Sequence, residues 1–92
     1  MKDLIGREFL YSGRVQGVGF RQSVYTLAMR QQVDGYVQNL ENGKVRLVVE
    51  GACDEVDDLL EDVRTLWAHN ISDIQITDLQ TTGTFVGFSI RY

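Results

Sequence analysis

Histidine, cysteine and proline are nearly absent from this sequence, which has one histidine, one cysteine and no proline among its 92 residues. Cys53 therefore has no partner for an internal disulfide, and Cys53 with His69 does not make a Cys/His metal site. No apolar run approaches the length of a membrane span, and the segment Met1 to Gly6 is too short and too polar for a secretory signal. We therefore expect a cytoplasmic protein that binds no metal and does not enter a membrane.

Positive charge is also scarce, because nine lysines and arginines stand against thirteen acidic residues and give a net charge of -4. Such a chain as a whole repels nucleic acid. The acidic residues are crowded between Asp54 and Asp62, whereas Arg14 and Arg21 lie in a glycine-rich segment. A chain of this length makes one domain, residues 1–92, in which an active site is a surface groove built from loops. A small anionic ligand fits this distribution better than a nucleic acid does.

The glycine-rich segment, residues 13–21 with the sequence GRVQGVGFR, joins a predicted strand, Glu8–Ser12, to a predicted helix. The helix is indicated by apolar residues at helical spacing, Phe20, Val24, Leu27 and Ala28. Glycines allow successive backbone N–H groups to turn toward one point, and the start of a helix adds unpaired N–H groups and a partial positive charge. Arg21, in the first helical turn, would be repelled there unless an anion lay nearby. The segment therefore predicts an anion site that suits phosphate.

The rest of the chain predicts a second helix at Asp54–Trp67 and four further strands, at Tyr36–Leu40, Lys44–Glu50, Ile74–Leu79 and Val86–Tyr92. This order, β-α-β-β-α-β with one extra strand, predicts an α+β fold: a ferredoxin-like split βαβ sandwich, with two helices on one face of an antiparallel sheet. The first two strands run parallel because a helix connects them, so their carboxyl ends share one edge of the sheet. Asn39 should then face the glycine-rich segment.

The residue types at this edge favour one kind of chemistry. Arg21 offers a rigid fork of donors that grips two oxygens of a phosphoryl group, and it does not act as a base. Asn39 holds a water through its amide without taking a proton. No obvious base stands nearby in the sequence, which indicates a substrate whose leaving group is already good, so that positioning and charge stabilisation suffice. An acyl phosphate is such a substrate.

The segment GRVQGVGFR resembles the signature of the acylphosphatase family, and residues 35–45, GYVQNLENGKV, and 88–92, FSIRY, are similar to further blocks of that family. The resemblance runs from about Phe9 to Tyr92. It implies an enzyme that hydrolyses the carboxyl–phosphate bond of small acyl phosphates without metal or cofactor, with Arg21 binding phosphate and Asn39 orienting the attacking water. The implied substrate-binding residues are those of the loop, namely Arg14, Val15, Gln16, Gly17, Val18, Gly19 and Phe20.

Two positions depart from the family pattern. Gln32 stands where the family often has a glycine, which would cost roughly 1 kcal/mol if the position needs a positive φ. Arg46 occupies a position where glutamate is common. Both departures touch structure more than chemistry.

Two other functions stay open. The same fold serves RNA-recognition modules, but the predicted strand Lys44–Glu50 lacks the aromatic residues that such modules place there. The other alternative is a module that binds an acyl phosphate or carbamoyl phosphate without hydrolysing it. Nothing in the sequence indicates an obligate dimer, and we expect a monomer.

Overall fold

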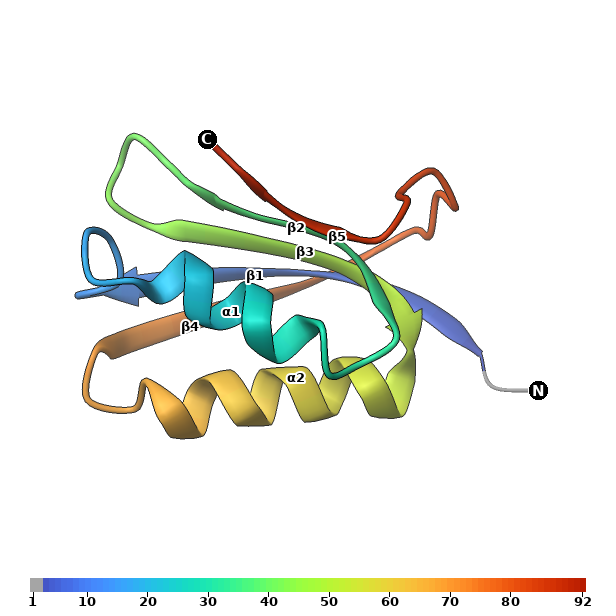
Figure 1. Ribbon diagram of the computed structural model, residues 1–92, viewed down its shortest axis with the longest axis horizontal. Helices are drawn as coiled ribbons and strands as arrows, with labels where there is room; N and C mark the ends of the chain where they lie inside the picture. The colour runs from blue at the N-terminus through green and yellow to red at the C-terminus, as the bar shows by residue number, and fades with distance from the viewer. Residues whose placement is uncertain (1–2) are drawn as a thin grey trace.

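The computed structural model describes residues 3–92 and shows two helices packed on one face of a five-stranded sheet (Figure 1). In chain order the elements are β1 (Leu4–Gly13), α1 (Phe20–Ala28), β2 (Val33–Asn39), β3 (Val45–Ala52), α2 (Cys53–Leu66), β4 (Ile71–Leu79) and β5 (Phe88–Arg91). This arrangement confirms the predicted α+β, ferredoxin-like fold with both helices on one face. Within residues 3–92, no helix is both long enough and apolar enough to cross a membrane.

The strands lie in the order β4-β1-β3-β2-β5. β1 pairs antiparallel with β3 and β4, and β3 pairs antiparallel with β2. Because β3 lies between them, β1 and β2 run in the same direction, as the helical connection between them requires. The register places the carboxyl ends of β1 and β2 at the same height in the sheet, because Tyr11 of β1 and Asn39 of β2 both pair with Val45 of β3.

The sequence predicted an antiparallel sheet, but the sheet is mixed, because the extra strand β5 pairs parallel with β2. The reason lies in the path of the chain. β4 ends at Leu79, which faces Gly6 near the beginning of β1. The next segment crosses that end of the sheet and meets β2 beside Gly35, so β5 can only run in the direction of β2. β5 is also shorter than the predicted Val86–Tyr92, and the side chain of Val86 is fully exposed.

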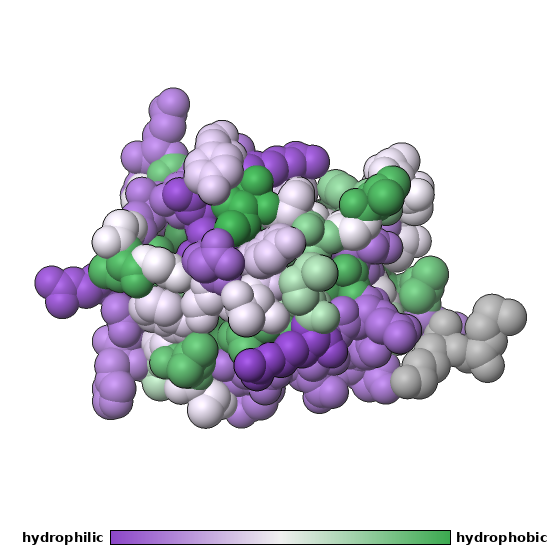
Figure 2. Space-filling model, viewed as in Figure 1, coloured by the Kyte–Doolittle hydropathy of each residue, from purple (hydrophilic) through white to green (hydrophobic). Residues whose placement is uncertain are grey.

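The core fills the layer between the sheet and the helices. Strand residues alternate between the two faces, so Phe9 and Tyr11 of β1 turn inward beside Leu47 of β3, and all three are buried. The inner faces of both helices meet them through fully buried residues, namely Phe20 and Val24 of α1 and Val56, Leu59 and Val63 of α2. Each such side chain contributes about 1.5–3 kcal/mol when it leaves water. Figure 2 shows that mainly hydrophilic side chains, in purple, surround the scattered hydrophobic ones on the helix-covered face.

The backbone accommodates both departures from the family pattern. No non-glycine residue in the described chain has a positive φ, so Gln32 does not carry the cost considered above. Arg46 lies on the strand face that turns away from the helices, where its Nε is 3.1 Å from Oε2 of Glu8 on β1. The arginine thus makes an ion pair between neighbouring strands.

Candidate active site

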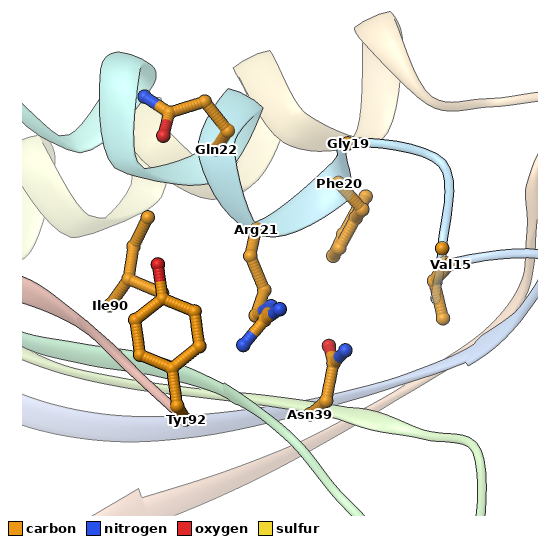
Figure 3. Close-up of a pocket in the computed structure, with 9 residues that line it drawn as sticks. Val15, Gly19, Phe20, Arg21, Gln22, Asn39, Ile90 and Tyr92 are labelled. Atoms are coloured by element: carbon orange, nitrogen blue, oxygen red, sulfur yellow. The ribbon is translucent and has the colours of Figure 1, made fainter.

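The carboxyl ends of β1 and β2 lie at the same edge of the sheet, on either side of β3, and Figure 3 shows the side chains that gather near the first turn of α1. A pocket of about 160 Å³ lies at this point. Its lining residues come from the glycine-rich loop, α1, β2, β5 and the residue after β5, and are Val15, Gly17, Gly19, Phe20, Arg21, Gln22, Asn39, Ile90 and Tyr92. The structure therefore brings Asn39 to the loop, as the strand order predicted.

The first half of the loop between β1 and α1, residues 14–16, is held by hydrogen bonds and burial. The backbone N–H of Arg14 donates to the Asn70 carbonyl at 2.8 Å, and Nδ2 of Asn70 donates back to the Arg14 carbonyl at 3.0 Å. Nε2 of Gln16 donates to the carbonyl groups of Leu40 and Lys44, at 2.8 and 2.9 Å. The side chain of Val15 is buried. These contacts fix the loop against the β2–β3 hairpin and the start of β4.

Glycine is required in this loop for its backbone conformation. Gly17 and Gly19 have φ of 74° and 85°, and space beside each of them is open. Gly19 is also the N-cap of α1, where no side chain caps the helix and no acidic residue lies in the first turn. The first N–H groups of a helix have no acceptor within the helix. The start of α1 therefore presents unneutralised donors and a partial positive charge at the pocket.

Arg21 extends from this first turn across the pocket (Figure 3). Its Nη1 donates to the carbonyl oxygen of Arg91 at 3.1 Å, and its guanidinium carbon lies 4.8 Å from the ring centre of Tyr92. None of the ion pairs found within residues 3–92 includes Arg21. The guanidinium is therefore held in place by a carbonyl group and an aromatic ring, while its charge stays available to an anion.

Asn39 points from the end of β2 into the pocket, with its side-chain oxygen on the side of Arg21 (Figure 3). That oxygen, Oδ1, is buried and accepts no hydrogen bond from the described part of the chain. A buried polar atom left without a partner costs about 1–3 kcal/mol. The asparagine thus has a free acceptor directed at the space where a ligand or water would lie.

An aromatic cluster supports the start of α1. The ring of Phe20 packs edge-on against Tyr11, with ring centres 5.1 Å apart, and against Trp67, at 5.2 Å. Nε1 of Trp67 also donates to Oγ of Ser23 at 2.8 Å, which ties the end of α2 to α1. Burial raises the pKa of Tyr11, so its hydroxyl stays neutral at ordinary pH. The cluster therefore serves packing and supplies no base.

Three loop residues predicted to bind substrate do not line the pocket: Arg14, Gln16 and Val18. The amide of Arg14 and the side chain of Gln16 are used in fixing the loop, and Val18 is exposed. Sequence reasoning missed Gln22, Ile90 and Tyr92. Alternation placed Ile90 and Tyr92 on one face of a strand, but only the parallel pairing of β5 with β2 puts that face beside Arg21.

No ionisable carboxylate or imidazole lines the pocket. Across residues 3–92, moreover, no three His, Cys, Asp or Glu side chains gather as a metal site would need. The arrangement can hold an anion with backbone donors and one guanidinium, and it can orient one water. It offers no side chain suited to proton abstraction at neutral pH.

Comparison with known proteins gives consistent matches. The family model described as Acylphosphatase matches residues 7–90. An acylphosphatase of Methanocella arvoryzae is 38% identical over 85 residues, which cover 91% of this chain and 96% of that protein. An acylphosphatase of Syntrophus aciditrophicus is 40% identical over 81 residues, covering 87% and 84% of the two chains. The crystal structure of acylphosphatase from Bacillus subtilis superposes with a TM-score of 0.85 at 29% identity, covering 96% of this chain and 99% of that one.

Proposed function

Because the chain belongs to the acylphosphatase family and is an enzyme of that kind, we propose that it hydrolyses the carboxyl–phosphate bond of small acyl phosphates at the pocket between Arg21 and Asn39. One observation carries the assignment of the site. The guanidinium of Arg21, which belongs to none of the ion pairs found within residues 3–92, and the unpartnered Oδ1 of Asn39 line one small pocket at the start of a helix that no side chain caps. The two side chains to which we assign phosphate binding and water orientation thus line the same small space.

In this proposal the phosphoryl group binds at the glycine-rich loop. Backbone N–H groups of the loop and of the first turn of α1 donate to its oxygens, and the guanidinium of Arg21 grips two of them. The Arg91 carbonyl occupies only one guanidinium nitrogen, Nη1. The other donors of the fork are left for phosphate, whose charge spreads over three oxygens.

Asn39 orients the attacking water by accepting one of its hydrogens at Oδ1. The water oxygen forms a bond to phosphorus while the bond from phosphorus to the carboxyl oxygen breaks, and the carboxylate leaves without needing a proton. The proton that the water loses passes to an oxygen of the substrate's own phosphate, because the pocket lining includes no carboxylate or imidazole. The products are a carboxylate and inorganic phosphate. The protein contributes position and charge stabilisation.

The proposal extends to the surroundings of the reaction. Residues 1–92 act as one monomeric cytoplasmic domain, the reaction uses no metal or cofactor, and the partner is a small acyl phosphate.

An RNA-binding role is disfavoured by the outer face of the sheet. There the guanidinium of Arg91 covers the ring of Tyr36, and the guanidinium carbon lies 3.7 Å from the ring centre. An aromatic ring covered in this way is not free to stack on a base.

Hydrolysis of benzoyl phosphate in the presence of a chelator tests this function. We expect turnover by the wild type and its loss in Arg21→Ala and in Asn39→Ala, with both variants still folded by circular dichroism. Arg64→Ala, which removes an exposed arginine of α2, is the matched control and should keep full activity. If the folded wild type binds inorganic phosphate but shows no turnover, the chain is a binding module for acyl or carbamoyl phosphate instead.

A further inference from the structure

The position of Arg21 depends on the last strand of the sheet. Its guanidinium contacts the carbonyl of Arg91, the last residue of β5, and the ring of Tyr92, which follows directly after β5. None of the ion pairs described within residues 3–92 holds this side chain. Whatever fixes β5 therefore fixes the guanidinium at the pocket.

β5 itself is only lightly held. It is four residues long, lies at the edge of the sheet and pairs with a single neighbour, β2. Its first residue, Phe88, is buried and faces Tyr25 of α1 with ring centres 6.3 Å apart. A strand this short contributes few backbone hydrogen bonds of its own, so the segment that leads into it matters for its placement.

That segment, residues 80–87, contains no helix or strand and crosses the end of the sheet (Figure 1). Two carboxylates, those of Asp34 and Glu50, accept hydrogen bonds from it. At the end beside β5, Oδ1 of Asp34 accepts a hydrogen bond from the Gly87 N–H at 3.0 Å. The carbonyl of the same Gly87 accepts one from the Gly35 N–H, also at 3.0 Å. Gly87 is thus fixed on both sides at the point where the β2–β5 register begins.

Glu50, on β3, accepts hydrogen bonds from the middle of the 80–87 segment. Its Oε2 accepts hydrogen bonds from the N–H and the Oγ1 of Thr82, at 2.7 and 2.9 Å, and its Oε1 accepts one from the Gly83 N–H at 3.0 Å. Desolvation raises the pKa of Glu50, but these hydrogen bonds outweigh it and lower the pKa below its ordinary value. Hydrogen bonds to a charged carboxylate are stronger than those between neutral groups.

We propose that Asp34 and Glu50 are positioning residues for Arg21. Their carboxylates fix the 80–87 segment, the segment sets the register of β5, and β5 presents the Arg91 carbonyl and the Tyr92 ring that hold the guanidinium. The inference rests on the proposed role of Arg21 in binding phosphate. A guanidinium held in place before the substrate arrives loses less freedom on binding, and phosphate then binds more tightly.

The test compares Asp34→Ala with Asp34→Asn, because the amide of asparagine keeps an oxygen acceptor for the Gly87 N–H. Two quantities are measured: the NMR signal of the Arg21 side-chain Nε–H, and the inhibition constant of inorganic phosphate. We expect Asp34→Ala to broaden or shift the Arg21 signal and to weaken phosphate binding by roughly three- to ten-fold. Asp34→Asn should restore both quantities.

Asp57→Ala is the control for a general loss of stability. It removes a carboxylate that pairs with Arg7 at 2.7 Å, on the side of the sheet away from β5, and should leave the Arg21 signal and phosphate binding unchanged. If Asp34→Ala does not fold, Glu50→Gln replaces it, because the glutamine nitrogen cannot accept a hydrogen bond from the 80–87 segment. The same changes in the Arg21 signal and in the inhibition constant of phosphate are then expected.

Two outcomes separate this inference from the proposed function. If the Gly87 amide exchanges faster in Asp34→Ala while the Arg21 signal and the phosphate constant stay at wild-type values, the positioning role is overturned. If the wild type neither binds phosphate nor hydrolyses acyl phosphates, the proposed function fails. The Arg21 signal alone then decides the positioning role, supporting it if it changes and overturning it if it does not.

Discussion

The guanidinium Nη1 of Arg21 donates a hydrogen bond to the carbonyl oxygen of Arg91 at 3.1 Å, across 70 positions of the sequence. This contact joins the first turn of α1 to the end of β5. The side chain that binds phosphate in our account is therefore oriented by a segment far away in the sequence. The first half of the glycine-rich loop is oriented by the β2–β3 hairpin and by Asn70, just before β4.

Removal of the Tyr92 ring should loosen Arg21. The ring centre lies 4.8 Å from the guanidinium carbon, and the tyrosine is highly exposed, so the interaction falls in the weaker range of cation–π pairs. We expect Tyr92→Ala to raise the inhibition constant of phosphate by about two- to five-fold. Tyr92→Phe keeps the ring and should match the wild type. Equal constants in all three proteins would show that the ring does not hold Arg21.

Replacement of Asn39 should affect turnover more than binding. The asparagine orients water rather than phosphate in our account, so Asn39→Ala should lower kcat by about 100-fold or more and leave KM within a few-fold of the wild type. Steady-state kinetics with benzoyl phosphate measure both constants. A large rise in KM at unchanged kcat would instead place Asn39 among the groups that bind the substrate.

Gly13 should tolerate no side chain. It has a φ of 120°, and a Cβ built there would overlap the carbonyl oxygen of Asn70. Gly43, with a φ of 88° and open space around it, provides the comparison. Gly43→Ala should cost about 1 kcal/mol of unfolding free energy, and Gly13→Ala clearly more, about 2 kcal/mol or above. Urea denaturation measures both; equal costs would contradict the predicted overlap.

The stabilising contribution of Glu50 should depend on pH. Its pKa is lowered in the folded state, because the hydrogen bonds from Thr82 and Gly83 outweigh desolvation. Such a group stabilises the fold above its unfolded pKa, about 4, and the contribution is lost as the pH falls through the folded value. Wild type and Glu50→Gln should therefore differ in unfolding free energy at pH 6–7 and converge below pH 4. A difference that is the same at pH 3 and pH 7 would contradict the role of the charge.

The sequence predicts much of the site because local rules determine it. The helical connection makes β1 and β2 parallel, and this alone brings Asn39 level with the loop, where both Asn39 and Tyr11 face Val45. The positive φ of Gly17 and Gly19 is a conformation that glycine adopts readily. These features need only neighbours in sequence or one rule of topology.

The contribution of the last strand could not be predicted in the same way. Alternation identifies Phe88, Ile90 and Tyr92 as one face, but it does not say which strand they pair with or in which direction. The answer depends on the path of residues 80–87 and on their contacts with Asp34 and Glu50, which lie more than 30 positions away. The use of the Gln16 side chain to fasten the loop to the hairpin is likewise a tertiary contact that no local pattern indicates.

Hydrolysis of an acyl phosphate in water labelled with oxygen-18 tests the central claim most directly, because it shows which bond the water attacks. If the loop and Arg21 hold the phosphoryl group while Asn39 directs water at phosphorus, the label must appear in inorganic phosphate and be absent from the carboxylate. Mass spectrometry of the two products reads this out. Label in the carboxylate would mean attack at the carbonyl carbon, and it would contradict the account.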